Sequence, residues 1–398
     1  MGFRKFQADA IFTGTELLDA DQVLITDDKG IVIEILPSTE AGENVQQLKG
    51  WLSPGFINCH CHLELSHMKG LIPEHTGLVD FIMAILSQHH FPEDEILQSI
   101  SDAETSMIQN GIVAVGDISN NAISFQQKST NNLAWHGFLE ISGFSPQIAN
   151  MRFETGLAYY HQFEQLLGDD FKLSMAAHAP YSVSNKLWEL MKPYYKNKTT
   201  SLHNQETDFE DDFLGFKKGD FTRLYKNLKV DTSFYEPSGK SSLQSVANHF
   251  EGANNALLVH DTFTNETDIE FIKALSIKQA TNYYYCLCVN ANQYINKALP
   301  PINNFRKHHC SIVLGTDSLA SNHCLSILDE IKTISKNFPT ILLTEQLQWA
   351  TLNGAKALGF DKRYGSFEKG KQPGVNLITG IYENKITSMS KIESPIVR

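Results

Sequence analysis

The chain lacks the apolar features that would tie it to a membrane. No window approaches the roughly 18 unbroken apolar residues that a membrane-spanning helix needs. The first residues, MGFRKFQADAIFTG, have no long apolar core of the signal-peptide type. We therefore expect no membrane partner and a cytoplasmic location.

Cysteine and positive charge are also scarce. Six cysteines in 398 residues do not make a disulfide framework, so we expect reduced thiols. The C-x-C pairs are closer than the C-x2-C spacing of zinc sites, which favours buried thiols over metal ligands. The net charge of −12 argues against a nucleic-acid partner. Internal repeats and low-complexity tracts are absent as well.

What the chain does contain is a series of short apolar runs separated by helix-length stretches. The runs cover residues 54–60, 111–119, 133–142, 171–179, 200–206, 256–261, 280–289 and 311–318. Eight strand–helix units in succession favour a closed parallel barrel of the α/β class, and the pattern alone leaves an open doubly wound sheet as the alternative. Both ends of the chain show strand and turn signals, so they can meet as one small domain.

An H-x-H motif stands at the end of the first run. Side chains alternate between the two faces of a strand, so His60 and His62 should share one face while Cys59 and Cys61 point the other way. Two imidazoles on one face can hold one metal ion at about 2.0–2.1 Å per nitrogen. From the pair alone, two solvated or hydrogen-bonded histidines are an equal alternative. Two adjacent pairs, His89–His90 and His308–His309, are expected at the surface.

Other runs also end in residues of the metal-ligand type. His178, His203, His260 and Asp317 each stand at the end of a run, and Glu206 follows three residues after His203. In a barrel all carboxyl ends of the strands converge on one face, where the active site lies. Five strand ends with such residues favour a metal site over satisfied core histidines.

The ordered set of motifs resembles the amidohydrolase superfamily, in its cytosine deaminase-like, chlorohydrolase-related branch. The stretches that carry the resemblance are PGFINCHCHLELS, AAHAPYSVS, LHNQET, LLVHD, LGTDSLASN and TLNGAKALG with GSFEKGKQPGVNLI. The resemblance implies a distorted (β/α)8 TIM barrel over residues 54–360. It also implies a small β-sandwich domain built from residues 1–53 and 361–398.

The resemblance further implies site roles and one divalent metal ion, with zinc expected first and ferrous iron fitting the same ligands. Glu206 would be the proton shuttle, His260 would lie beside the reacting water, and His178 would contact the substrate. Binuclear members carry a carboxylated lysine where this chain has His178, which favours a single ion. The implied metal ligands are His60, His62, His203 and Asp317.

Several further residues are candidates for substrate contacts. Glu64 follows the H-x-H motif and would bind the substrate or pair with Lys69. Asn290 lies where relatives have a CP-x-(S/A)-N stretch, although Val289 replaces the proline here. The loops that follow the strands supply the remaining candidates, namely Ser66, Tyr181, Ser318 and Ser321.

Three functions follow from this set. The first is a metal-dependent hydrolytic deaminase of an amino-substituted heterocycle, an adenine-type nucleoside such as aminodeoxyfutalosine, adenosine or S-adenosylhomocysteine. The second is a chlorohydrolase or cyclic-amide hydrolase of the same superfamily. The third is a non-catalytic scaffold with the same fold, which would show gaps among the ligands. The expected partner is a small-molecule heterocyclic substrate, and a homodimer is left open.

Overall fold

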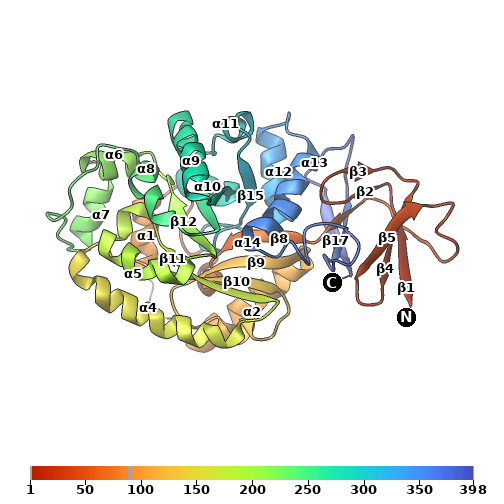
Figure 1. Ribbon diagram of the computed structural model, residues 1–398, viewed down its shortest axis with the longest axis horizontal. Helices are drawn as coiled ribbons and strands as arrows, with labels where there is room; N and C mark the ends of the chain where they lie inside the picture. The colour runs from red at the N-terminus through yellow and green to blue at the C-terminus, as the bar shows by residue number, and fades with distance from the viewer. Residues whose placement is uncertain (1, 88–90, 398) are drawn as a thin grey trace.

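The computed structural model describes residues 2–87 and 91–397, and its central feature is a set of eight parallel strands (Figure 1). Each of the eight apolar runs forms one strand. The strands are β8 (Phe56–Cys61), β9 (Ile112–Ser119), β10 (Ala134–Ile141), β11 (Phe171–Ala177), β12 (Thr199–Asn204), β13 (Asn255–His260), β14 (Asn282–Leu287) and β15 (Ser311–Leu314). The pair His89–His90 lies outside the described residues.

The strands follow one another in chain order in two four-stranded sheets, β8 to β11 and β12 to β15. Backbone hydrogen bonds link the sheets at both seams. The amide of His203 donates to the carbonyl of His178 at 3.0 Å, and the amide of Thr316 donates to the carbonyl of His60 at 3.0 Å. A parallel bridge also joins Cys61 to Asp317. The predicted distorted (β/α)8 barrel is therefore confirmed.

Helices cover the outside of the barrel because one face of each strand presents apolar side chains outward. Leu139, Leu173 and Leu258 belong to this outer cluster. Ser184 caps the helix α5 (Asn185–Tyr195) and Asn265 caps the helix α9 (Glu266–Gln279), in each case with a side-chain oxygen that accepts a backbone N–H group. The helices are α1 (Leu78–Ser87), α2 (Glu93–Gln109), α3 (Phe125–Lys128), α4 (Ala149–Phe163), α5 (Asn185–Tyr195), α6 (Phe209–Phe216), α7 (Phe221–Asn227), α8 (Ser242–Val246), α9 (Glu266–Gln279), α10 (Val289–Asn296), α11 (Ile302–Lys307), α12 (Ile327–Asn337), α13 (Leu343–Gln348) and α14 (Gly354–Leu358).

A separate cluster fills the inside of the barrel, and it corrects one expectation about β8. The cluster includes Ile57, Cys59, Phe138 and Val259, which come from three different strands. Cys59 therefore faces the barrel interior, whereas Cys61 packs in the outer cluster. The register between β8 and β9 shifts in this part of the strand, and such a bulge changes the side on which the following residues lie.

Strands from both ends of the chain share a sheet beside the barrel. One sheet has the order β17-β16-β7-β2-β3 and the other β5-β4-β1-β6. Figure 1 shows the strands β1 and β17, near the two ends of the chain, at this same end of the molecule. The division at residues 53/54 and 360/361 stays a prediction. The strands are β1 (Phe3–Gln7), β2 (Ala10–Phe12), β3 (Leu17–Leu18), β4 (Gln22–Asp27), β5 (Val32–Pro37), β6 (Gln46–Gln47), β7 (Trp51–Pro54), β16 (Val375–Thr379) and β17 (Lys391–Val397).

Within the described ranges, no helix has both the length and the apolar character required to cross a membrane. The polar stretch 207–250 contains the three short helices α6, α7 and α8.

A buried ion pair supports the end of β8. The Nζ atom of Lys128 lies 2.5 Å from Oδ2 of Asp117, and neither side chain is exposed. The other carboxylate oxygen of Asp117 accepts the amide of Leu63 at 2.8 Å, directly after His62. The ion pair thus connects the barrel wall to the backbone that carries the H-x-H motif.

Replacing Lys128 with Met is expected to lower the free energy of unfolding by about 3–5 kcal/mol, because Asp117 would keep a buried charge without its partner. Urea denaturation measures this change. The matched control is Lys192→Met, which removes a partly exposed lysine 3.2 Å from the exposed Glu251 and should cost less than about 1 kcal/mol. Equal losses in the two variants would contradict the interpretation.

Candidate metal centre and active site

Four potential metal ligands gather at the carboxyl end of the barrel. Nε2 of His62 lies 3.1 Å from Nε2 of His203. Oδ1 of Asp317 lies 3.6 Å from Nε2 of His60 and 3.5 Å from Nε2 of His62. All four side chains are buried. The structure therefore brings together the whole set of expected ligands, from β8, β12 and the loop after β15.

The spacing and chemistry of this set fit one divalent ion. Ligand atoms at about 2.1 Å from a tetrahedral centre lie about 3.4 Å from one another, close to the distances between the donors here. Neither ring nitrogen of His60 has a hydrogen-bond partner, although the ring is fully buried. Buried polar atoms are rarely left unpaired without a reason, and a metal ligand is one such reason.

Unusual backbone conformations turn several of these residues toward the centre. Asp317 has a φ of +59° and His260 a φ of +77°, both in the left-handed region that is costly for residues other than glycine. Leu258 faces the outer helices, so regular alternation would also turn His260 outward. The left-handed turn brings its ring to 5.5 Å from the ring of His203 instead. Such strain is typical of functional sites.

Hydrogen bonds on the far side of the rings fix their orientation. Nδ1 of His203 lies 2.7 Å from the carbonyl oxygen of His178 and therefore donates to it. Nδ1 of His260 lies 2.8 Å from Oδ1 of Asn292. A proton held on Nδ1 leaves Nε2 as the free electron pair, which is the form that a metal ligand or proton acceptor needs.

Burial sets the charge of the centre. It lowers the pKa of His60 and of His62 to about 4, so both rings are neutral at pH 7. For Asp317, burial acts to raise the pKa, but the imidazoles of His60, His62 and His260 around the carboxylate outweigh it, so the pKa falls below its usual range. Two neutral imidazoles and an ionised carboxylate are ligands in their metal-binding forms.

Glu206 lies beside this centre with its carboxyl group buried. Its Oε2 is 3.8 Å from Nε2 of His260. Its backbone is held on both sides, because its amide donates to Glu210 at 3.3 Å and its carbonyl accepts from Asn296 at 3.0 Å. Burial and the charge of Asp317 raise the pKa of Glu206 to about 8. The group therefore carries a proton at neutral pH and can act as an acid.

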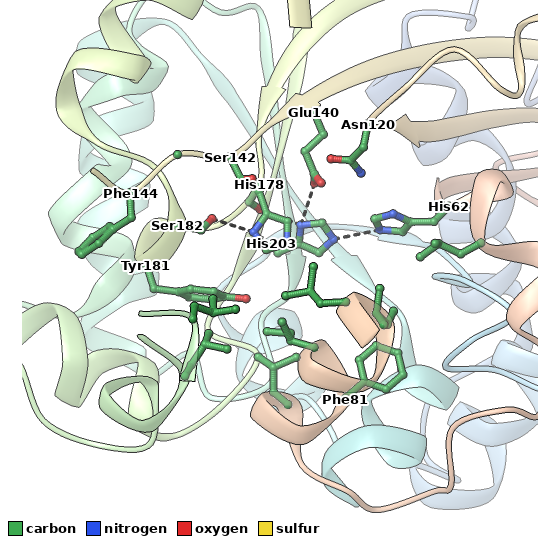
Figure 2. A pocket seen from close by; sticks show the side chains of 18 of the residues that line it. His62, Phe81, Asn120, Glu140, Ser142, Phe144, His178, Tyr181, Ser182 and His203 are labelled. Atoms are coloured by element: carbon green, nitrogen blue, oxygen red, sulfur yellow. Dashed lines mark hydrogen bonds and ion pairs between the residues drawn. The ribbon is translucent and has the colours of Figure 1, made fainter. Parts of the chain in front are cut away.

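The expected substrate contacts divide into those that reach the cavity and one that does not. His178, Ser318 and Glu64 line a cavity of about 870 Å³ that opens from the centre (Figure 2). Asn290 does not line it, because its side-chain oxygen accepts from Thr333 at 2.6 Å. The structure thus corrects the assignment of Asn290. The neighbouring Asn292 contacts His260.

Glu64 is hydrogen-bonded to Asn120 and not paired with Lys69, the partner considered from the sequence. Both carboxylate oxygens accept the amide of Asn120 at 3.1 Å, and Oε1 also accepts its side-chain amide at 3.0 Å. The partner is therefore Asn120 and not Lys69. Burial raises the pKa of Glu64 to about 7.

The remaining loop candidates have mixed positions. Tyr181 lines the cavity. Ser321 donates to Oδ2 of Asp317 at 2.5 Å and thereby helps to fix the carboxylate. Ser66 donates to the carbonyl of Leu63 at 2.7 Å and stabilises the turn after the H-x-H motif. The rings of His308 and His309 lie away from the cavity.

Sequence reasoning missed Glu140. This residue lies near the end of β10, lines the cavity, and has Oε1 at 3.3 Å from Nδ1 of His203. It shares the strand face of Phe138, which points into the barrel. A carboxylate at an inward position near a strand end was the signal that would have found it.

Apolar side chains form most of the cavity wall away from the centre. They come from α1 and from the segment that includes α7, with Phe81, Leu224 and Phe234 among them. The cavity has the size of a site for a drug-sized ligand, about 300–1,000 Å³. A single heterocycle would fill only part of it.

Imidazoles and a carboxylate gathered at the carboxyl end of a parallel barrel, next to a buried acid, define a metal-dependent hydrolase of the barrel type. The chain belongs to the amidohydrolase family, whose profile matches residues 51–396. An adenosine deaminase from Helicobacter pylori is 26% identical over 330 residues, which cover 81% of this chain and 77% of the relative.

Two solved structures share the fold. One is the aminofutalosine deaminase of Helicobacter pylori in complex with methylthio-coformycin, with a TM-score of 0.78, 24% identity and coverage of 96% of this chain and 93% of that one. The other is an adenosine deaminase from Xanthomonas campestris with bound zinc, with a TM-score of 0.68, 20% identity and coverage of 94% and 84%.

Proposed function

We propose that this protein is a metal-dependent hydrolytic deaminase that removes ammonia from an amino-substituted heterocycle, an adenine-type nucleoside in the first instance. The observation that carries the proposal is the placement of the buried acid Glu206 beside His260 and the four expected ligands. The names of similar proteins, an adenosine deaminase and an aminofutalosine deaminase, support the same reaction class. Zinc is the proposed ion, because one of the structures with this fold holds it and His and Asp are its usual ligands.

Asp317, His260 and Glu206 have different roles in the proton transfers of the reaction. When bound, a divalent ion would supply a nucleophilic water near neutral pH, since it lowers the pKa of that water toward about 7. Asp317 can take a proton from the water through its carboxylate. Nε2 of His260 can accept a hydrogen bond from the same water, because the Nδ1 proton is held by Asn292. Glu206 can donate its proton to the ring nitrogen beside the carbon under attack.

The cavity supports a substrate that is larger than a free base. Its apolar wall suits a nucleoside with a further substituent, such as aminodeoxyfutalosine, better than cytosine or guanine. Adenosine and S-adenosylhomocysteine remain in the proposed class. Which of these nucleosides is preferred depends on the loops that line the cavity.

Release of ammonia from a panel of compounds tests the function. The panel holds aminodeoxyfutalosine, adenosine, S-adenosylhomocysteine, adenine, guanine and cytosine. We expect at least one adenine nucleoside to have a kcat/KM about 100-fold above those of guanine and cytosine, because only a nucleoside contacts both the centre and the apolar wall. A panel without ammonia release, together with chloride release from a chlorotriazine or opening of a cyclic amide, would overturn the proposal.

The cellular location, the substrate class and the oligomeric state complete the proposal. We propose a cytoplasmic enzyme, consistent with six cysteines that form no disulfide within the described residues. The net charge of −12 supports a small-molecule substrate rather than a nucleic acid. A homodimer is testable by light scattering of the purified chain.

A further inference from the structure

Glu140 is a buried acidic residue beside the metal cluster that does not belong to the four expected ligands. Its Oε1 lies 3.3 Å from Nδ1 of His203, and its side chain is 2% exposed. Figure 2 shows the carboxylate beside one ring nitrogen of His203 and His62 beside the other. Potential ligand atoms of Glu140, His178 and His203 lie within 4.8 Å of one another.

The partners of this carboxylate are unusual. Among the described residues, no lysine or arginine forms an ion pair with Glu140, and His203 is its only ion-pair partner. Its Oε1 atom also has no hydrogen-bond partner of good geometry, because the Nδ1 proton of His203 points to the nearer carbonyl of His178. A buried carboxylate is costly unless a positive charge is close to it. When His203 is neutral, as a metal ligand must be, no described side chain that pairs with Glu140 carries a positive charge, so the balancing charge has to come from a bound cation.

The metal cluster can supply that positive charge. Asp317 is the only carboxylate in the four-ligand set, so it offsets one of the two charges of a divalent ion. The carboxylate of Glu140 is separated from the cluster only by the ring of His203. A second negative charge in this position stabilises a cationic centre in a buried, weakly screened environment. It also makes the ring of His203 a stronger electron donor, as carboxylates behind ligating imidazoles do.

We propose that Glu140 is a positioning residue that strengthens metal binding through His203, an inference that rests on the metal centre of the proposed function. The carbonyl of His178 fixes which nitrogen of His203 carries the proton. Glu140 supplies the negative charge behind the same ring. The carboxylate does not touch the ion itself, and its effect reaches the centre through the imidazole.

The test is the dissociation constant for zinc of the full chain, measured by competition with a fluorescent chelator. Glu140→Gln keeps the shape of the side chain and removes its charge, and zinc binding should weaken about 10- to 100-fold. The matched control is Glu64→Gln, which makes the same change in a buried carboxyl of the same cavity whose partner is Asn120 and not a ligand. Its zinc affinity should stay within about threefold of wild type.

A second measurement separates this role from a structural one. Melting temperatures of the metal-free and zinc-loaded forms give the stabilisation that zinc adds. We expect Glu140→Gln to reduce this increment, and Glu140→Asp, which keeps the charge, to retain more of it. An equal loss of stability in both forms with an unchanged increment would show a purely structural role and overturn the proposal.

Two further outcomes distinguish the possible failures. If Glu140→Gln binds zinc as tightly as wild type while its KM rises, the carboxylate serves the substrate and the proposal is wrong, although the proposed function stands. If the wild-type chain binds no divalent ion, the proposed function itself fails. Zinc affinity is measured without the enzymatic reaction, so a failure of the Glu140 proposal is distinguishable from a failure of the proposed function.

Discussion

Replacing Glu206 with Gln should leave metal binding intact and lower kcat by about 1,000-fold, within the range for loss of a general acid–base group. The amide has the shape of the acid but no proton to give to the ring nitrogen. The carboxyl oxygens of Glu206 are not among the four expected ligands, so zinc should still bind. Steady-state ammonia release and metal analysis of the same preparation measure both effects.

Glu210→Gln is the control for this substitution. Glu210 is also a buried acid on the same turn, and burial raises its pKa to about 8, but it does not line the cavity. It accepts the amides of Gln205 and Glu206 and the hydroxyl of Ser242. Its loss should therefore reduce stability more than chemistry. A Glu206→Gln enzyme with the kcat of wild type would remove Glu206 from the mechanism.

The barrel and the clustering of the expected ligands were predictable because they depend on the order of the strands along the chain and not on exact side-chain contacts. An apolar run that ends in a ligand-type residue needs only a parallel barrel to bring that residue to the common face. His60, His203 and Asp317 lie far apart in the chain, yet each follows the same local pattern. When the barrel closes, the ends of these strands lie side by side, which brings the ligand atoms to 3.1–3.6 Å from one another.

The contacts that the sequence did not predict depend on local backbone changes. Ile57 and Cys59 share the inner face, but Cys61 leaves it because the register of β8 shifts, and strict alternation cannot anticipate such a bulge. The stretch after β14 continues as the helix α10 and not as a strand. Helical spacing places Asn290 and Asn292 on different sides, which explains why the second, and not the first, reaches His260.

Long-range polar partners were unpredictable for another reason. Glu64 meets Asn120, a residue 56 positions away with no motif around it. Glu140 had a local signal, an acidic residue at an inward position of a strand, but the strand carries no histidine at its end to draw attention to it. Lys172 stands at the start of β11, with its Nζ 5.2 Å from the ring of Phe360. It is therefore at the wrong end of the strand to bridge two ions.

Removal of the metal is the second change with a large expected effect. Elemental analysis should give one divalent ion per chain and not two, because His178 occupies the place of a bridging lysine and Lys172 lies at the opposite end of the strand. Stripping the ion with a chelator should lower turnover to below about 1%, since the nucleophilic water depends on it. Added zinc should restore activity and, at 100-fold above its Kd, stabilise the fold by about 2.7 kcal/mol.

Two histidine variants make this test specific to the cluster. His60→Ala removes a ring that is buried with both nitrogens unpaired, so it should abolish both zinc binding and turnover. His161→Ala removes an exposed ring that pairs with Glu164 outside the cavity, and zinc binding should not change. A chain that contains no metal after purification and gains no stability from zinc would be a scaffold. Four buried ligands, among which His60 and His62 have unpaired ring nitrogens, argue against that outcome, because a scaffold gains nothing from retaining a costly polar cluster in its interior.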